Sequence, residues 1–297
     1  MFMGLSAFPL TPMNESSIDE AAFVGLIKKL TDANVHSIGV LGSTGSYAYL
    51  SREERNIVTK LAMDNAQDTP VVVGIGALRT KEVLLLADDA QKAGANGLLL
   101  APVSYQKLTD DEVFSHYEAV CKNISIPLCV YDNPGTTHFE FSDVLHGRIA
   151  ELPNVASIKI PPLPNNLEEA KTRVNRLRLQ IPTHVTIGIS GDHSGVMGLN
   201  AGCEVWYSVL GGLLPLPILE IVTASQAGKP DEVYRLSETL NPLWVFFCQH
   251  GSLRVIATIA ELMGLVKTPC LPLPVKSLSG EERKQLQTCI NNLGSLS

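Results

Sequence analysis

The stretch Lys92-Ala93-Gly94-Ala95-Asn96-Gly97-Leu98-Leu99-Leu100-Ala101 carries the pattern from which the fold can be inferred. A glycine directly after a helical stretch is typical of a helix C-cap, and the apolar run behind it is typical of a buried strand. Two other apolar runs are entered in the same way, through Asp32-Ala33-Asn34 and through Asn200-Ala201-Gly202. The repeating unit is therefore a helix followed directly by a buried strand.

Eight apolar runs of this kind occur, most of them about 25 to 35 residues apart. We predict strands at 5–7, 37–41, 71–75, 97–101, 128–131, 156–159, 185–189 and 205–209. A doubly wound open sheet shows the same alternation, but eight evenly placed units favour closure into a barrel. The predicted fold is α/β: a (β/α)₈ TIM barrel as catalytic domain over 1–225, with a C-terminal helical region over 226–297 packed on it.

Several sequence signals set the predicted helix boundaries. A hydroxyl residue followed three positions later by a glutamate is typical of a capping box. Such pairs occur at Ser17/Glu20, Ser51/Glu54, Thr109/Glu112 and Ser279/Glu282. Beyond the eighth strand we predict helices at 217–227, 230–248, 251–264 and 280–293, with the proline-rich segment 269–274 as an extended link between the last two.

Composition excludes several classes of protein. The chain has 30 acidic and 23 basic residues, a net charge of −7, and no run of Lys or Arg, so nucleic acid is not expected as a partner. Hydrophobic residues make up 45% and charged residues 18%, which excludes disorder and is compatible with a subunit that self-associates. The longest apolar stretch, 205–219, is broken by glycines and prolines, so no membrane span is expected.

The six cysteines form no C-x-x-C pair. This usage predicts reduced, buried thiols, and together with an N-terminus that has no signal-peptide pattern it predicts a cytoplasmic protein. The seven histidines show no metal-ligand spacing, so we predict no metal and no other cofactor.

Lys159 is the most informative polar residue, since it follows Val155-Ala156-Ser157-Ile158 and precedes Ile160 in a run that should be buried. Burial disfavours the charged amine and lowers its pKa, which is what a Schiff-base lysine requires. A lysine that reaches the rim of the barrel or pairs with an acid has the same sequence pattern.

The ends of the other strands supply further candidates, because barrel enzymes build their sites at the carboxyl ends of their strands. Tyr131 ends the fifth strand, next to the sixth, and its phenol could relay protons or serve as an ordinary core tyrosine. Ser43 and Thr44 lie between two glycines, where exposed amides and hydroxyls suit a carboxylate, although a plain turn has the same composition. Asp192-His193 could form an acid/base pair, but a solvated loop pair is the preferred interpretation.

These residues together resemble the dihydrodipicolinate synthase and N-acetylneuraminate lyase family of class I aldolases over nearly the whole chain. The segments that carry the resemblance are Gly42-Ser43-Thr44-Gly45, Tyr131-Asp132-Asn133-Pro134-Gly135, Ile158-Lys159 and Ser190-Gly191-Asp192. The resemblance implies a (β/α)₈ barrel, a homotetramer or homodimer, and an imine between Lys159 and pyruvate or a related 2-oxo acid.

The same resemblance assigns roles to single residues. Tyr131 and Thr44 would join Lys159 as the catalytic set, with Tyr131 moving protons. Ser43 and Thr44 would hold the carboxylate, and Tyr105, or Ser104 one position earlier, would reach the relay of a neighbouring subunit. Thr136, Gly191 and Ser208 complete the predicted substrate-binding set.

Three positions depart from the synthase pattern: Ser46 and Ile160 stand where the synthases have glutamates, and Thr136 where they have an arginine that meets the second substrate's carboxylate. We therefore predict a Schiff-base lyase or aldolase that takes a 2-oxo acid and an aldehyde less anionic than aspartate semialdehyde. Three alternatives stay open: a true 4-hydroxy-tetrahydrodipicolinate synthase, a non-catalytic barrel that binds a 2-oxo acid, and a phosphosugar enzyme. The last is disfavoured because Asp192 would repel a phosphate.

Overall fold

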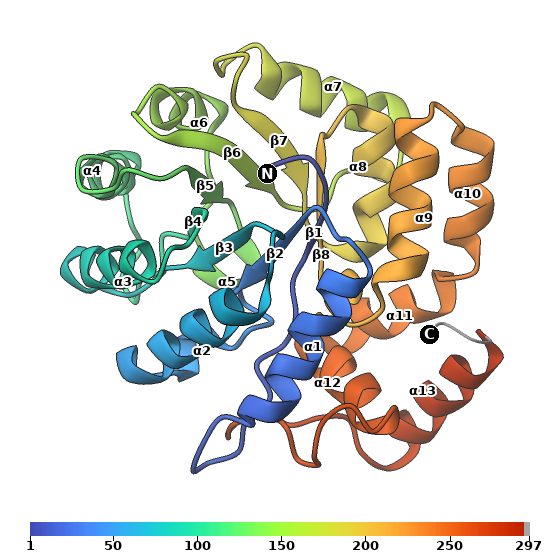
Figure 1. Ribbon diagram of the computed structural model, residues 1–297. Coiled ribbons are helices and arrows are strands. Elements are labelled where there is room, and N and C mark those ends of the chain that lie inside the picture. Colours follow the sequence, from blue (N-terminus) through green and yellow to red (C-terminus); the bar gives the residue numbers. More distant parts are fainter. Residues whose placement is uncertain (294–297) are drawn as a thin grey trace.

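The computed structural model describes residues 1–293 and contains a closed barrel of eight parallel strands in chain order (Figure 1). β1 pairs with both β2 and β8, which closes the sheet. The strands are β1 (Gly4–Ala7), β2 (Ser37–Val40), β3 (Val71–Gly74), β4 (Gly97–Leu100), β5 (Leu128–Tyr131), β6 (Val155–Ile160), β7 (Thr186–Ile189) and β8 (Val205–Ser208). The predicted (β/α)₈ barrel is confirmed, and every strand agrees with its predicted bounds to within one residue at either end.

Helices connect the strands and surround the sheet (Figure 1). They are α1 (Glu20–Asp32), α2 (Arg52–Asn65), α3 (Thr80–Lys92), α4 (Asp110–Cys121), the short α5 (Pro134–Thr137), α6 (Asp143–Ala150), α7 (Leu167–Arg178) and α8 (Gly195–Ala201). The predicted helix ends are confirmed at Asn34, Gly94 and Gly202, whose φ angles are 58°, 88° and 102°. Positive φ ends a helix and turns the chain back toward the sheet.

The buried apolar residues form two clusters, because successive side chains of a strand point to opposite faces. Leu98 and Leu100 of β4 belong to the large cluster between sheet and helices. Leu99 belongs to a smaller one with Phe8, Tyr131 and Tyr207. This second cluster fills the interior of the barrel, so the barrel is packed and the site must lie at one of its ends.

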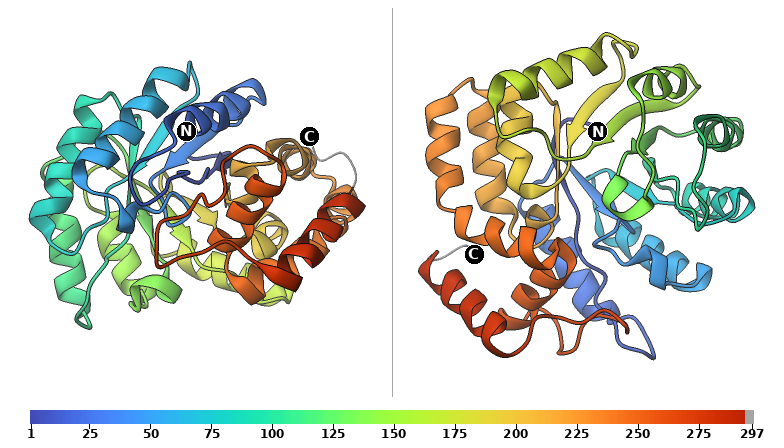
Figure 2. Two further views of the ribbon diagram at one scale, coloured as in Figure 1. Left: turned by 90° about the horizontal axis from the view of Figure 1, so that it is seen from below. Right: turned by 180° about the vertical axis from the view of Figure 1, so that it is seen from behind.

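The C-terminal helices gather along one side of the barrel, beside α1 and α8 (Figures 1 and 2). They are α9 (Pro215–Gln226), α10 (Pro230–Glu238), α11 (Asn241–His250), α12 (Ser252–Leu262) and α13 (Gly280–Asn292). The single helix predicted over 230–248 is wrong, because the chain breaks at Thr239 and Leu240 and a new helix begins with Pro242 in its first turn. Proline cannot donate the helical hydrogen bond, and it fits the first turn well.

Two of the four predicted capping boxes are confirmed. Ser51 with Glu54 and Thr109 with Glu112 make both reciprocal hydrogen bonds. Ser279 does flank α13, but its side chain makes no capping hydrogen bond. The Glu282 carboxylate lies instead 3.9 Å from Nδ1 of His250, so that box is wrong.

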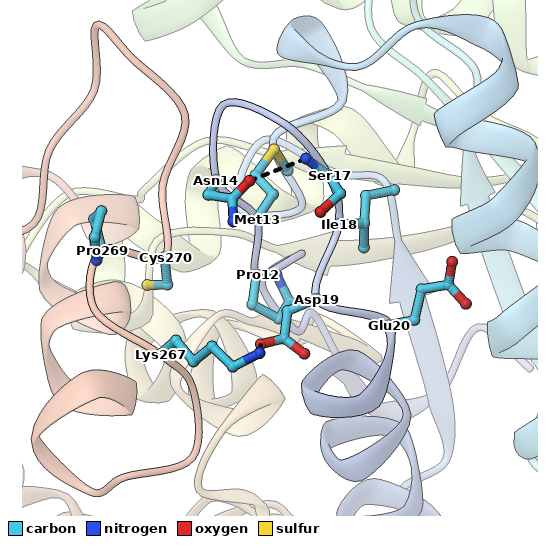
Figure 3. A pocket seen from close by; sticks show the side chains of 10 residues that line it. All are labelled: Pro12, Met13, Asn14, Ser17, Ile18, Asp19, Glu20, Lys267, Pro269 and Cys270. Atoms are coloured by element: carbon cyan, nitrogen blue, oxygen red, sulfur yellow. Dashed lines mark hydrogen bonds and ion pairs between the residues drawn. The ribbon is translucent and has the colours of Figure 1, made fainter.

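The box predicted at Ser17/Glu20 is also wrong. Asp19 caps α1 by accepting a hydrogen bond from the amide of Ala22 at 3.2 Å. Ser17 belongs to the preceding turn, where its amide donates to Oδ1 of Asn14 (Figure 3). Asp19 also pairs with Lys267, Nζ to Oδ2 3.2 Å, and so connects the start of α1 to the segment behind α12 (Figure 3).

The six cysteines are free, and most are buried as predicted. Cys248 is the exception, since it lies exposed on α11, and Cys289 is half-buried. Over residues 1–293, none of the helices combines the length and the apolar character that a bilayer crossing requires.

Candidate active site

Lys159 lies near the end of β6 with its side chain inside the barrel, where it is 5% exposed. Its nitrogen lies 4.0 Å from the centroid of the Phe8 ring and 4.1 Å from that of Tyr131. Tyr131 is its register partner across the β5–β6 pair. The predicted adjacency of these two side chains is confirmed, and aromatic rings enclose the amine on two sides.

This enclosure changes the acid–base properties of the amine. Burial lowers the pKa of Lys159 to about 8. The acidic groups of Cys129 and Asp192 nearby raise that pKa, but by less than burial lowers it. A buried ammonium loses hydration, whereas a neutral amine loses little. A useful fraction of Lys159 is therefore neutral and nucleophilic near neutral pH.

Tyr131 presents a protonated phenol beside this amine. Burial raises the pKa of Tyr131 to about 12, and the nearby Ser43 hydroxyl partly offsets that effect. The phenol oxygen accepts a hydrogen bond from Nδ2 of Asn133 at 3.0 Å. Since the phenol keeps its proton over the working pH range, it can donate that proton and recover it within one reaction cycle.

The loop after β2 carries two hydroxyls at the carboxyl end of the strands, which we call the mouth of the barrel. Thr44 is buried, Ser43 is half-buried, and the flanking Leu41 and Ser46 both have a φ of 56°. A Cβ at Gly45 would lie 2.8 Å from the amide nitrogen of Leu41, so only glycine allows this tight fold-back. Left-handed backbone at non-glycine residues costs free energy and often accompanies a functional constraint.

A cavity of about 390 Å³ opens beside this loop. Ser43 and Thr44 line it together with Thr136 of α5 and the segment from Gly251 to Arg254. Thr136 is exposed, and its hydroxyl donates to the carbonyl of Asn133 at 3.4 Å. Three of the predicted site residues thus share one cavity.

The remaining predicted site residues lie elsewhere at the mouth. Gly191 follows β7 with a φ of 79°. Ser208 ends β8, is fully buried, and accepts a hydrogen bond from the amide of Gly211 at 2.8 Å. Tyr105 is 91% exposed and is not among the described residues that line the cavity.

Asp192 is not the solvated loop residue predicted from the sequence. It is buried and accepts hydrogen bonds from the indole nitrogen of Trp206 at 3.0 Å and from the amides of Val209 and Leu210. It therefore ties β8 and the turn behind it to the loop after β7. The prediction failed because an aspartate in a loop is usually solvated. The hydrogen-bond donors that allow Asp192 to be buried lie 14 to 18 residues further along the chain.

Asp132 and His146 form a second buried pair directly behind Tyr131. Nε2 of His146 lies 3.4 Å from Oδ2 of Asp132. Burial raises the pKa of Asp132 to about 7 and lowers that of His146 to about 3. The backbone amide of Asp132 donates to the carbonyl of Lys159 at 3.0 Å, which joins the two strands at the site.

Sequence reasoning missed the aromatic residues that enclose Lys159. Phe8 belongs to the N-terminal segment, and Tyr207 stands on β8 with its ring centroid 5.3 Å from Nζ. The available signal was a glycine inside each of two strands, Gly39 in β2 and Gly188 in β7, which often marks a close approach by another group. A Cβ at either glycine would lie 2.3 Å or less from the Phe8 or Tyr207 ring.

Among residues 1–293 no group of three or more His, Cys, Asp or Glu side chains is close enough together to hold a metal ion. The expectation that the reaction uses no metal stays a prediction.

Comparisons with known proteins agree with this geometry. The model of the dihydrodipicolinate synthetase family matches residues 1–293. The chain is 27% identical to the 4-hydroxy-tetrahydrodipicolinate synthase of Cellvibrio japonicus, over 99% of this chain and 100% of that protein. The corresponding protein of Bradyrhizobium diazoefficiens is 30% identical over 82% of this chain and 80% of its own length.

Solved structures are similar over the same length. The dihydrodipicolinate synthase of Agrobacterium tumefaciens is 43% identical, with a TM-score of 0.95 and coverage of 99% of this chain and 98% of that one. The chloride-inhibited dihydrodipicolinate synthase of Acinetobacter baumannii, complexed with pyruvate, is 25% identical, with a TM-score of 0.89 and coverage of 99% of both chains. Together with the matching family model, this similarity confirms the resemblance inferred from the motifs: the chain belongs to the dihydrodipicolinate synthetase family, a family of class I aldolase-type lyases.

Proposed function

We propose that the protein joins or cleaves a carbon–carbon bond between a 2-oxo acid, such as pyruvate, and an aldehyde, through an imine on Lys159. The observation that carries this proposal is the position of the Lys159 amine, 4.1 Å from the ring of Tyr131 and with a pKa lowered to about 8. A nucleophilic amine and a proton-carrying phenol are the two groups that imine chemistry requires.

The reaction proceeds in balanced steps. The neutral amine of Lys159 attacks C2 of the 2-oxo acid, and the resulting carbinolamine loses water to give an iminium ion. Loss of a proton from C3 gives an enamine, whose carbon attacks the aldehyde and forms the new bond. Tyr131 gives a proton to the leaving hydroxyl of the carbinolamine and recovers one from C3. It then protonates the new alkoxide and recovers a proton from the water that hydrolyses the product iminium. Hydrolysis then releases the product and restores Lys159.

The amides and hydroxyls of Ser43 and Thr44 hold the carboxylate of the 2-oxo acid in this proposal. Both residues lie at the mouth of the barrel, and Ser43 is close enough to Tyr131 to affect its pKa. Donors fixed by a tight loop bind a carboxylate with little loss of entropy. Gly191, after β7, and Ser208, at the end of β8, complete the substrate-binding set in this proposal.

The acceptor in this proposal is an aldehyde other than aspartate semialdehyde. A threonine hydroxyl at position 136 offers one neutral donor where an arginine would offer two parallel charge-assisted ones. Thr136 lines the cavity and its side chain is already bonded to the backbone of Asn133.

We also propose that the working form is a homodimer or homotetramer. Tyr49, Leu78 and Tyr105 are large apolar side chains exposed on loops after three successive strands. A group of exposed apolar side chains on one side of the mouth supports an interface in which a second copy of the chain buries them. Sedimentation velocity tests this: a monomer at micromolar concentration would contradict it.

Borohydride reduction in the presence of pyruvate, followed by intact-mass measurement, tests the central proposal. Formation of an irreversible adduct on Lys159 is expected. An unmodified chain under these conditions would contradict imine chemistry and leave the 2-oxo-acid-binding barrel as the better account.

A further inference from the structure

We propose that Arg254 binds a terminal carboxylate of the aldehyde acceptor, and of the longer 2-oxo acid formed from it. This inference rests on the proposed function, because it concerns the second substrate of the same site. Arg254 belongs to α12, in the C-terminal helical region, and it lines the cavity that Ser43, Thr44 and Thr136 also line.

Arg254 is the one charged side chain among the residues of 1–293 that line this cavity. Its guanidinium makes a single weak hydrogen bond, from Nη1 to the carbonyl of His250 at 3.4 Å. Across the described part of the chain it forms no ion pair, whereas Arg52, Arg148 and Arg176 each lie within ion-pair distance of an aspartate. A guanidinium left without an anion beside a cavity is available to bind one.

The local backbone strengthens this argument. Gly251 separates α11 from α12 with a φ of 81°, and no side chain caps the N-terminus of α12. Because α12 begins at Ser252, the exposed Arg254 lies in its first turn, where the helix dipole disfavours a cation. A carboxylate bound between the arginine and the open end of α12 would remove that repulsion and meet donors from both.

A second feature of the same cavity indicates a polar ligand. Ser46 lines it and is 1% exposed, yet its hydroxyl has no hydrogen-bond partner among the described residues. Buried hydroxyls are usually paired, so an orphan at a cavity wall is typical of a site that a ligand or water completes. Ser252, from the other wall, offers a further hydroxyl.

Arg254 changes the conclusion drawn from Thr136 alone. Without an arginine at position 136, the sequence predicts an acceptor less anionic than aspartate semialdehyde. The folded chain brings a cation to the cavity from a segment 118 residues further along. The acceptor class is therefore an aldehyde whose carboxylate reaches Arg254 on the α12 wall of the cavity. Aspartate semialdehyde, whose carboxylate would meet position 136 instead, stays a poor acceptor.

Analogues of the condensed product that can form an imine but have no 4-hydroxyl, and so cannot be cleaved, test this without knowledge of the natural aldehyde. The diacids 2-oxoadipate, 2-oxopimelate and 2-oxosuberate each carry a 2-oxo acid head and a terminal carboxylate, and 2-oxooctanoate carries the same head with an uncharged tail. The concentration needed for half-maximal borohydride trapping on Lys159 is measured for each compound and for pyruvate.

We expect Arg254→Gln to raise this concentration by roughly 10-fold for at least one diacid, since a charge-assisted pair at a partly hydrated site is lost. The values for pyruvate and 2-oxooctanoate are expected to stay within about twofold. Arg254→Lys should retain part of the diacid preference. Arg235→Gln, which removes an exposed arginine of α10 outside this cavity, is the matched control and should change none of the values.

Equal values for the diacids in the wild type and in Arg254→Gln would overturn the inference, as would a wild type that traps pyruvate but no diacid. A wild type that traps no pyruvate would contradict the proposed function itself, and this inference with it. Equal shifts for pyruvate and diacids in Arg254→Gln would indicate a general structural defect and would also overturn it.

Discussion

Lys159 and Tyr131 are register partners across the β5–β6 pair, and the lysine nitrogen lies 4.1 Å from the centroid of the tyrosine ring. The backbone of the closed sheet fixes this relationship, because both residues belong to strands and neither depends on a loop. Sites built on strands hold their geometry more accurately than sites built on loops. Strand pairing therefore fixes the relative position of the two residues.

Lys159→Ala is expected to abolish borohydride trapping with pyruvate while the fold is retained, since the nucleophile is lost and only a small cavity is left. Lys159→Arg should fail equally, because a guanidinium stays protonated and cannot attack a carbonyl. Intact mass and circular dichroism measure the two effects. A stable pyruvate adduct on the alanine variant would show that another amine forms the imine.

Tyr131→Phe is expected to separate imine formation from proton transfer. The imine should still form, more slowly, whereas proton exchange at C3 of the bound 2-oxo acid should fall by roughly 10² to 10⁴. Exchange into deuterated water, followed by NMR of pyruvate, measures this rate directly. Wild-type exchange in the Phe variant would make Tyr131 a structural residue.

The rate of imine formation is expected to follow the neutral fraction of Lys159. With a pKa lowered to about 8, the amine is about one-tenth neutral at pH 7, so the rate should rise with pH and level off above about 8. The Tyr131 phenol, whose pKa is raised to about 12, should add no second inflection below pH 10. An inflection near the ordinary lysine value would mean that Lys159 is hydrated in solution.

Thr136 predicts poor activity with aspartate semialdehyde. Replacing a bidentate, charge-assisted contact by one neutral donor should weaken the transition state by about 2 to 4 kcal/mol, or roughly 30- to 1,000-fold in kcat/KM. Thr136→Arg is expected to recover part of that loss. A wild-type kcat/KM of about 10⁴ M⁻¹s⁻¹ or more with pyruvate and aspartate semialdehyde would instead identify a true synthase.

Gly39→Ala is expected to destabilise the protein and to disturb Lys159 through Phe8. The added Cβ would lie 2.3 Å from the Phe8 ring, which itself packs on the lysine nitrogen. Overpacking of this kind costs about 1 to 3 kcal/mol, and a displaced ring should let water reach the amine and raise its pKa. Thermal unfolding and the pH profile of trapping measure both effects.

Gly25→Ala is the matched control, because nothing lies within 4 Å of the position of its Cβ. Gly25 is an exposed position inside α1, so alanine there should raise stability slightly through helix propensity. Equal behaviour of the two variants would argue against a tight Phe8 contact.

The sequence by itself determined the barrel and its central pair. Strand positions follow from local apolar runs, and helix ends at Asn34, Gly94 and Gly202 follow from residues that tolerate positive φ. Both signals are local, so they can be read without the fold. Lys159 and Tyr131 could be paired because sequential strands of a parallel barrel are neighbours, which converts chain order into spatial order.

Only the tertiary structure decided the surroundings of that pair. Phe8 and Tyr207 enclose Lys159 because β1 closes against β8, and Asp192 is buried because Trp206 and Leu210 donate to it. Arg254 lines the cavity because α12 packs beside the loop after β2 and beside α5. These contacts join segments far apart in the chain, and no local pattern encodes the distance at which two such segments meet. The charge and hydration around Lys159 depend on these contacts. The sequence was therefore enough to predict which two residues face each other, but not which side chains surround them or line the neighbouring cavity.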